Sequence, residues 1–518
     1  MRRIAALILI AMAITGCVPV EVSGAEPGEK FTGLFSALDK YIEKGMKDWD
    51  VPGLAVAVVR GDEIIYTRTF GVKRLGTNDP VTEDTIFQIG STSKAFTCTL
   101  AAMLADEKKL RLDAKVAEIL PDFKMYDPWV TDNFMVIDLM AQRSGLPAHA
   151  GDTLSTVGFS RQEILSRMRY VKPISSFRSK YAYQNNMFLA AAAVIEKVTG
   201  KSWEQCLKEK IFDPLGMTAS SCDEASFVNS PDAAALHRRI NGRVVALPKD
   251  WGYGFWVYTY GPAGGINSNI KDYAEWLKFQ ITGGRAADKQ LISKEALEFT
   301  HLPQTITRVP TENGLQQYYC LGWVYRENNP YPIIWHNGGT SGHKTMIAMM
   351  PQSNIGIAVL SNNSDAELPE AVAFRFFDIY CGNPEKDYSA EMLKKDKEKE
   401  ALDRSKEPGR PENPAPPVPL EKYTGVFTND LYGDITVNTA GAGGLSIVIG
   451  PAKMRLSLKA WDADTFKATF AIFAEEEDAG LVRFSRDASG NIGSLDIEML
   501  DEDGCGAFTR TQPEPAIK

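Results

Sequence analysis

The residues best suited to chemistry are Ser91 and Lys94, which lie three positions apart in the segment FQIGSTSKAFT. An apolar, helix-forming run follows them. Residues three apart on a helix share a face, so the Lys94 amine is expected beside the Ser91 hydroxyl. An ordinary serine is a poor nucleophile, but a neighbouring amine that takes its proton turns it into an acyl-transfer group. The free N–H groups at a helix start also favour developing negative charge.

The same Ser-x-x-Lys spacing occurs twice more, as Ser268 with Lys271 and as Ser341 with Lys344. Ser268 precedes an amphipathic helical pattern, which predicts a helix-capping region with Lys271 on the solvent side. Ser341 lies in a Gly-rich turn. Only Lys94 is placed on a helix with little polar surface, where the burial of a lysine needs a functional reason.

The elements around Ser91 predict an α/β fold. An amphipathic helix is expected over residues 31–47, a β-hairpin over 54–70, and mostly helical structure over 94–279. Strand patterns then return at residues 320–325, 333–336, 345–350 and 355–360, and a closing helix is expected over 367–380. A sheet built from both ends of a region, with a helical block between them, has a cleft where the two meet. The segment that carries Ser91 begins at that cleft.

The N-terminal stretch MRRIAALILIAMAITGC predicts an export signal within residues 1–25. It has a charged start and an apolar run too short to remain as a membrane-spanning helix. The residues before Cys17 resemble the lipobox of bacterial lipoproteins, in which that cysteine is lipidated. Cleavage after Ala25, in the small-x-small pattern Ser23-Gly24-Ala25, is the alternative. Both predict an exported protein of the cell envelope or periplasm, lipid-anchored or secreted.

Composition limits the class of protein further. A chain of 518 residues has room for two or more domains. Its hydrophobic share of 44% and charged share of 24% are ordinary for a globular protein. The formal net charge of -9 argues against nucleic acid as a partner. No Cys-x-x-Cys or metal-ligand spacing of histidines occurs, so no metal and no other cofactor is predicted; cysteine pairing stays open.

The chain changes character near residue 384. Residues 384–420 predict a linker, with a Lys/Glu-rich run expected to form a solvated helix and a proline-rich stretch after it. Residues 421–512 alternate like strands between Gly and Asp turns, which predicts a second, β-rich domain. This domain shows no catalytic constellation. Packing or oligomerisation is its expected role, and the alternative is a loop that restricts access to the cleft.

The segment FQIGSTSKAFT resembles the active-site segment of the serine β-lactamase/penicillin-binding-protein superfamily, in its class C-like branch of S12-type serine peptidases. Six further stretches agree in the same order: VIDLMAQRSGLP, YAYQNNMFLAAAAVIEKVTG, IFDPLGMTAS, GPAGGINSNIKDYAEW, IIWHNGGTSGH and IGIAVLSNN. The resemblance implies a hydrolase domain over residues 26–383, with an antiparallel sheet flanked by helices and a helical subdomain. Residues 421–512 resemble the lipocalin-like β-barrel domains often attached to such hydrolases.

The resemblance also implies catalytic roles. Ser91 would be the nucleophile that forms the acyl-enzyme, and Lys94 would help to deprotonate it. Tyr183 would relay the proton to the leaving group, since that proton must reach it before the acyl-enzyme is stable. A phenol with pKa about 10 needs a neighbouring cation for this, and Lys94 is the expected one. Asn185 would hold the acyl side of the substrate. The structural alternative is that Tyr183 and Asn185 only satisfy hydrogen bonds at a helix start.

His336-Asn337-Gly338 stands where the family commonly has Lys-Thr-Gly. By the resemblance, His336 is a catalytic residue, and Asn337 and Gly338 bind substrate, the glycine by letting a strand backbone come close. The backbone N–H of Gly339 would form the oxyanion hole together with that of Ser91. The alternative is a histidine that only caps the end of a strand.

This third motif departs from that of true β-lactamases. A lysine there is a fixed cation that helps to bind the carboxylate of a β-lactam or of a C-terminal D-alanine. Histidine, with a pKa of about 6.5, is neutral above that pH, and Asn337 replaces a hydroxyl residue. We therefore expect an acyl-enzyme hydrolase of small peptides of D-amino-acid type, amides or esters.

Two alternatives to this hydrolase stay open. One is a class C-like β-lactamase or D-Ala-D-Ala carboxypeptidase. The other is a non-catalytic protein that binds a cell-wall fragment or a β-lactam. The expected partner is a small-molecule or peptide substrate, with membrane contact only through a lipid anchor. A homo-oligomer is a further possibility.

Overall fold

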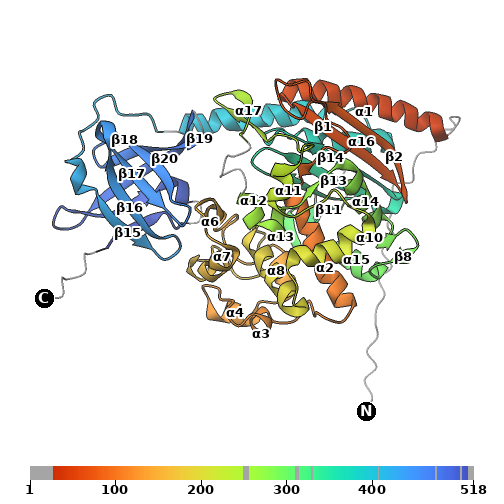
Figure 1. Cartoon of the computed structure of the whole chain (residues 1–518), viewed down its shortest axis with the longest axis horizontal. Coiled ribbons are helices and arrows are strands. Elements are labelled where there is room, and N and C mark those ends of the chain that lie inside the picture. Colours follow the sequence, from red (N-terminus) through yellow and green to blue (C-terminus); the bar gives the residue numbers. More distant parts are fainter. Residues whose placement is uncertain are drawn as a thin grey trace, which may run out of the picture.

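An eight-stranded antiparallel sheet organises the larger domain, residues 27–383, of the computed structural model (Figure 1). The structure describes residues 27–248, 256–309, 314–327, 331–406, 408–472, 475–501 and 504–511. The strand order is β2-β1-β14-β13-β12-β11-β10-β9. Its strands are β1 (Gly53–Arg60), β2 (Glu63–Gly71), β9 (Thr305–Arg308), β10 (Gln317–Tyr319), β11 (Val324–Arg326), β12 (Ile333–Gly339), β13 (Lys344–Met350) and β14 (Ile355–Ser361). The N-terminal hairpin thus joins strands from the end of the domain.

Helices cover both faces of this sheet. Side chains alternate between the two faces of a strand. On β1, Leu54, Val56 and Val58 face the helices α1 (Pro27–Trp49) and α16 (Leu368–Cys381). Ala55, Ala57 and Val59 belong to the other core cluster, which includes α2 (Ser93–Asp106) and α14 (Ile270–Ile281). Burial of β1 on both faces explains its nearly continuous apolar sequence.

A helical block connects β2 to the far edge of the sheet (Figure 1). Its helices are α2, α3 (Val116–Ile119), α4 (Pro128–Asn133), α5 (Val136–Met140), α6 (Thr153–Thr156), α7 (Arg161–Arg167), α8 (Asn186–Thr199), α9 (Trp203–Leu207), α10 (Asp213–Leu215), α11 (Glu224–Asn229), α12 (Trp256–Thr259), α13 (Gly261–Gly264), α14 and α15 (Lys294–Thr300). Its described residues also form short strand pairs: β3 (Phe87–Gln88) with β6 (Asn267–Ser268), β4 (His237–Ile240) with β5 (Arg243–Ala246), and β7 (Arg285–Ala286) with β8 (Lys289–Gln290). The predicted α/β fold class is confirmed.

The predicted strand over residues 320–325 is confirmed only for Val324 and Tyr325, which begin β11, and is wrong for the four residues before them. Residues 320–323 form the turn between β10 and β11, closed by a 2.8 Å hydrogen bond from the Cys320 N–H to the Trp323 carbonyl. Gly322 has φ 74°, and a Cβ there would lie 2.7 Å from the backbone of Ala95 in α2. The turn is therefore set by close packing against α2, which a strand pattern does not reveal.

A closed antiparallel barrel forms the C-terminal domain (Figure 1). Its strands are β15 (Gly425–Asn429), β16 (Gly433–Ala440), β17 (Gly444–Ile449), β18 (Met454–Asp462), β19 (Thr465–Ile472), β20 (Glu475–Arg486), β21 (Ile492–Ile497) and β22 (Ala507–Arg510). Pairing of β15 with β22 closes it. The mostly exposed helix α17 (Tyr388–Lys406) precedes it, as the Lys/Glu-rich run predicts.

The barrel packs against helices α6 and α7 and the β4–β5 hairpin of the larger domain. Polar contacts between the two domains include Thr153 Oγ1 to Tyr432 Oη at 2.5 Å, Arg167 Nη1 to the Leu431 carbonyl at 2.7 Å, the Ala452 N–H to the Val157 carbonyl at 3.0 Å, and Arg238 to Glu477 at 2.8 Å. The first three lie on one segment, residues 153–167.

Cys17 and the predicted export signal lie outside the described residues. Within the described ranges, no helix is long and apolar enough to cross a bilayer. Cys98, Cys206, Cys222 and Cys320 are buried free thiols.

Candidate active site

Ser91 lies on a short 3-10 turn, Gly90–Thr92, that leads directly into α2. Gly90 has φ 57°, and a Cβ on it would lie only 2.6 Å from the backbone N of Gly339. Any larger residue would push the end of β12 away from the serine. Glycine at this position therefore keeps the predicted oxyanion donor Gly339 next to the turn that carries Ser91.

Lys94 is fully buried beneath the serine. Its Nζ donates hydrogen bonds to Ser91 Oγ at 3.2 Å, to Asn185 Oδ1 at 2.6 Å and to the Ala263 carbonyl at 2.9 Å. Burial lowers the pKa of Lys94 to about 7, although the charge of Asp152 acts in the opposite direction. Near neutral pH a large fraction of this amine is therefore unprotonated, which a base that activates Ser91 requires.

Tyr183 and Asn185 lie just before α8 and face the same site. The Tyr183 hydroxyl hydrogen-bonds to Ser91, and Lys94 Nζ lies 4.6 Å from the centre of the Tyr183 ring. Burial raises the pKa of Tyr183 far above its usual value. The expectation that Lys94 favours a Tyr183 anion is thus not met, because burial dominates, and the phenol is neutral.

Asp152 and His149 extend the site and were not singled out from the sequence. Asn185 Nδ2 donates to Asp152 Oδ2 at 2.7 Å, and His149 Nδ1 lies 2.9 Å from the same oxygen. The His149 ring packs 5.3 Å from that of Tyr183, and its backbone N–H donates to the Tyr183 carbonyl at 2.7 Å. The available signal was that both residues lie within five positions after the segment VIDLMAQRSGLP.

His336 is a buried, neutral member of the site. Its Nε2 lies 3.3 Å from the Tyr319 hydroxyl, and its Nδ1 lies 2.6 Å from the carbonyl oxygen of Asn337. Burial, together with the charge of Lys94, lowers the pKa of His336 to about 3. The third motif therefore contributes no positive charge at neutral pH, as the replacement of lysine by histidine predicts.

The other two residues of the third motif, Asn337 and Gly338, make close contacts with neighbouring parts of the protein. Asn337 Nδ2 donates to Glu370 Oε1 on α16 at 2.8 Å. A Cβ on Gly338 would lie 2.0 Å from the Ile89 carbonyl oxygen. The close approach that this glycine permits is thus to the segment before Ser91, whereas we had expected an approach to substrate. Their substrate-binding roles remain predictions.

Lys344 is a cavity-lining cation that was not among the site residues predicted from the sequence. It stands opposite Gly339 in the register of β12 and β13. Its Nζ lies 3.2 Å from Glu370 Oε1, and the charge of Glu370 raises the pKa of Lys344. The short spacing between Gly339 and Lys344 could have indicated that they face each other across a hairpin. The pairing of Lys344 with Glu370 could not be predicted, because Glu370 is remote in the chain.

One cavity of about 780 Å³ brings most of the predicted residues together. Its lining includes Ser91, Tyr183, Asn185, His336, Asn337 and Gly339, together with His149, Asp152, Thr153, Thr156, Tyr181, Trp256, Val324, Tyr319, Trp335, Thr340 and Lys344. Lys94 lies beneath this surface and Gly338 behind it. Among the described residues, no group of three or more His, Cys, Asp or Glu side chains is placed to hold a metal ion.

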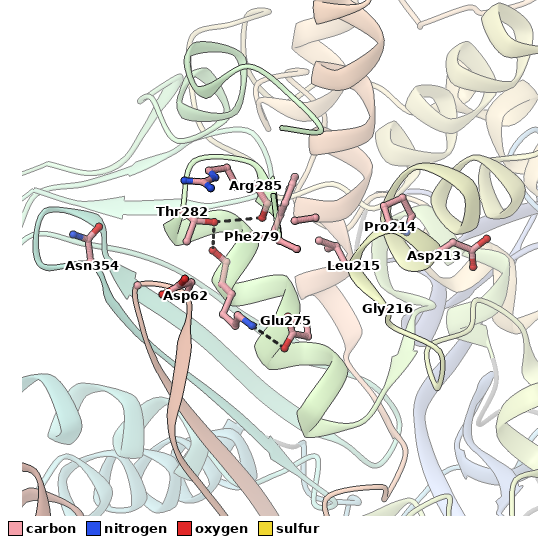
Figure 2. A pocket seen from close by; sticks show the side chains of 14 residues that line it. Asp62, Asp213, Pro214, Leu215, Gly216, Glu275, Phe279, Thr282, Arg285 and Asn354 are labelled. Atoms are coloured by element: carbon pink, nitrogen blue, oxygen red, sulfur yellow. Dashed lines mark hydrogen bonds and ion pairs between the residues drawn. The ribbon is translucent and has the colours of Figure 1, made fainter. Parts of the chain in front are cut away.

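A second cavity, of about 770 Å³, lies elsewhere on the larger domain (Figure 2). Figure 2 labels Asp62, Asp213, Glu275 and Arg285 in its lining, and Glu275 Oε2 lies 2.9 Å from Lys278 Nζ. None of the predicted site residues lies there. The Ser91 cavity is therefore the candidate active site.

Comparison with known families agrees with this geometry. The family model described as Beta-lactamase matches residues 38–376, and the chain belongs to the beta-lactamase family. It is a hydrolase of that family. A second model, described as a domain of unknown function (DUF3471), matches residues 409–512, which contain the barrel.

Several curated proteins are similar to this chain. Unguisins hydrolase ungD' of Aspergillus campestris is 29% identical over 425 residues, covering 76% of each chain. Unguisins hydrolase ungD of Aspergillus violaceofuscus is 25% identical, covering 81% of this chain and 79% of its own. Protein flp of Staphylococcus aureus is 24% identical over 65% of this chain and 64% of its own.

A solved structure matches both domains. It is described as the octameric penicillin-binding protein homologue from Pyrococcus abyssi, with a TM-score of 0.60 and 22% identity. The match covers 92% of this chain and 100% of the other. At this identity the likeness shows the fold alone, an α/β domain followed by a barrel.

Proposed function

We propose that this protein is a serine hydrolase that forms an acyl-enzyme on Ser91 and cleaves small peptides of D-amino-acid type, amides or esters. The observation that carries the proposal is the buried Lys94 amine, 3.2 Å from Ser91 Oγ. Its pKa of about 7 lets it take the serine proton near neutral pH. A buried lysine without such a task would only cost stability.

The neighbouring groups supply the remaining steps. As Ser91 Oγ attacks the substrate carbonyl, its proton passes to Lys94 and the carbonyl oxygen becomes an oxyanion, held by the Ser91 and Gly339 N–H groups. The neutral Tyr183 hydroxyl donates its proton to the leaving amine or alcohol and regains one from Lys94. Water then cleaves the acyl-enzyme by the reverse proton path and regenerates Ser91.

The charges on the leaving-group side disfavour a substrate carboxylate. His336 is neutral there, and among the described lining residues the one fixed cation, Lys344, is paired with Glu370. A β-lactam or a C-terminal D-alanine would bring a carboxylate without an unpaired cation to receive it. Two relatives are named as hydrolases, which favours turnover over binding alone.

Labelling with a fluorophosphonate probe, followed by intact-protein mass spectrometry, tests the nucleophile. We expect one adduct on the wild type, none on Ser91→Ala, and an unchanged adduct on Ser268→Ala, a matched control from a second Ser-x-x-Lys. No adduct on the wild type would move the assignment to a binding protein. Nitrocefin hydrolysis far faster than that of any ester or peptide would instead indicate a β-lactamase.

For location and assembly we propose an exported protein, lipidated on Cys17, that can form homo-oligomers. The export-type N-terminal sequence supports the first part, and the description of the related Pyrococcus abyssi protein as octameric supports the second. Loss of fatty-acid labelling in Cys17→Ala tests lipidation. Light scattering on the purified protein tests assembly, and a monomer at all concentrations would contradict it.

A further inference from the structure

We propose that Asp152 selects substrates with a protonated amino group on the acyl side of the bond that Ser91 attacks. Such substrates are peptides, amides or esters whose reacting carbonyl belongs to a residue with a free α-amine. This inference rests on the proposed acyl-enzyme function of Ser91 and names its substrate class.

Hydrogen bonds connect the Asp152 carboxylate to Ser91 through Asn185 and Lys94. Asp152 Oδ2 accepts from Asn185 Nδ2 at 2.7 Å, Asn185 Oδ1 accepts from Lys94 at 2.6 Å, and Lys94 contacts Ser91 at 3.2 Å. The carboxylate thus lies a short chain of hydrogen bonds from the nucleophile. An α-amine is bonded to the carbon next to the reacting carbonyl, so it enters the same part of the cavity.

The charges around the cavity leave the Asp152 carboxylate without a lysine or arginine partner among the described residues. Among the described residues that line this cavity, Asp152 is the only carboxylate. Its ionic contact among the described residues is with His149, whose side chain is 53% exposed, and no described lysine or arginine pairs with it. Asp152 Oδ1 is buried and has no hydrogen-bond partner among the described residues. A half-buried carboxylate of this kind is stabilised by an incoming cation.

Aromatic rings form much of the cavity surface. Rings of Tyr181, Tyr183, Tyr319 and Trp256 line the same cavity. Aromatic faces attract an ammonium group through their negative quadrupole. The opposite end of the site has its lysine, Lys344, neutralised by Glu370. The cavity therefore offers a carboxylate and aromatic rings to a cation, and no unpaired cation to an anion.

Binding of an ammonium group also bears on the base. The charge of Asp152 raises the pKa of Lys94. A substrate cation that pairs with Asp152 cancels this effect and repels a protonated Lys94. It therefore favours the unprotonated form of the Lys94 side chain. Substrates with an α-amine are thereby expected to react at lower pH than equivalents without one.

The test compares kcat/KM for D-alanine p-nitroanilide with that for two analogues. Propionyl p-nitroanilide lacks only the amine, and N-acetyl-D-alanine p-nitroanilide has it acylated. We expect kcat/KM for the free amine to exceed both others by about tenfold or more. This preference should decline above about pH 8, where an α-amine loses its proton. Asp152→Asn should bring the ratio of kcat/KM between the free amine and each of the other two substrates to about one, whatever its effect on the rate common to all three.

Glu204→Gln is the matched control, since Glu204 pairs with Arg161 and does not line the cavity. It should keep the full preference. An equal loss on all three substrates in Asp152→Asn would show that Asp152 only positions Asn185, and so overturns the inference. A wild type without preference for the free amine overturns it as well.

A second measurement avoids dependence on the variant's folding. D-alaninamide should protect wild-type Ser91 from the fluorophosphonate probe at about tenfold lower concentration than propionamide. Equal protection by the two overturns the inference. Absence of any labelling of Ser91 is a different result, because it contradicts the acyl-enzyme function itself.

Discussion

The two domains treat ionisable groups in opposite ways. The larger domain buries many charged or titratable side chains, among them Lys94, Asp138, His336 and Glu370. Within the described part of the barrel, Ser446 is the one buried polar side chain apart from the tyrosines, and no Lys, Arg, Asp, Glu or His side chain is buried there. The barrel interior is otherwise aliphatic and aromatic.

This difference separates a chemical site from a packing unit. A buried charge costs several kcal/mol unless partners compensate it. Some of these groups have plain structural partners, as Asp138 has in Arg143 and Arg178. Lys94 has only neutral partners and a pKa of about 7, so its cost is explained by the reaction. The barrel carries no comparable cost, in keeping with a structural role beside the site.

Removal of the Ser91 nucleophile should affect the chemical site strongly and the packing of the protein hardly at all. Ser91→Ala should lower kcat/KM on any hydrolysed ester by on the order of 10⁵-fold. The melting temperature should hardly change, because only one hydroxyl is removed. Steady-state kinetics and calorimetry measure both. Residual activity above about one per cent of wild type would place the nucleophile elsewhere.

Acid should destabilise the larger domain at a higher pH than the barrel. Burial lowers the pKa of four histidines, all in the larger domain, to about 3 or 4: His237, His301, His336 and His343. Their stabilising effect is complete above about pH 6.5 and is lost as pH falls toward 4, because the unfolded chain binds the protons first. Each costs about 1.4 kcal/mol per pH unit in that window.

The barrel sequence contains no histidine. Hydrogen exchange between pH 7 and 4 should therefore show protection lost in the larger domain while barrel strands retain theirs. Loss of both at the same pH would mean that the domains unfold as one unit.

Lys94→Met should lower the activity and raise the stability of the protein. We expect kcat to fall about 10³-fold, since the base that activates Ser91 is gone, while the free energy of unfolding rises. In the wild type, the folded pKa of about 7 lies below the usual 10.5, so stability increases as pH rises from 7 to 10.5. Denaturant titrations at pH 7 and 10 should show this increase in the wild type and not in the variant.

The smallest effect concerns the contact between the domains. Tyr432→Phe removes the hydrogen bond to Thr153, which lines the cavity. We expect KM to change by about two- to fivefold at constant kcat, and a stability loss of about 1 kcal/mol. Tyr423→Phe is the barrel control, since its hydroxyl contacts Asp464 within the barrel. A KM change of equal size there would attribute the effect to barrel stability alone.

Local sequence patterns predicted much of the fold and the centre of the site. Alternation of apolar residues located β12 to β14, and the spacing of Ser91 and Lys94 placed their side chains together. Asp152 was missed because its role depends on contact with Asn185, 33 residues later in the chain. Lys344 was missed because its partner Glu370 lies on another element. The pKa of Tyr183 depends on burial, which no local pattern specifies.

The order of strands in the sheet has a consequence for synthesis. β1 pairs with β14, so that Leu54 lies opposite Ser361. A growing chain cannot complete the centre of its sheet until about residue 361 has emerged, and such distant pairings form slowly. Until then the apolar β1 lacks one neighbour and is prone to aggregate. Chains that end before β14 should therefore be insoluble, and the larger domain cannot be divided within this interval into parts that fold alone.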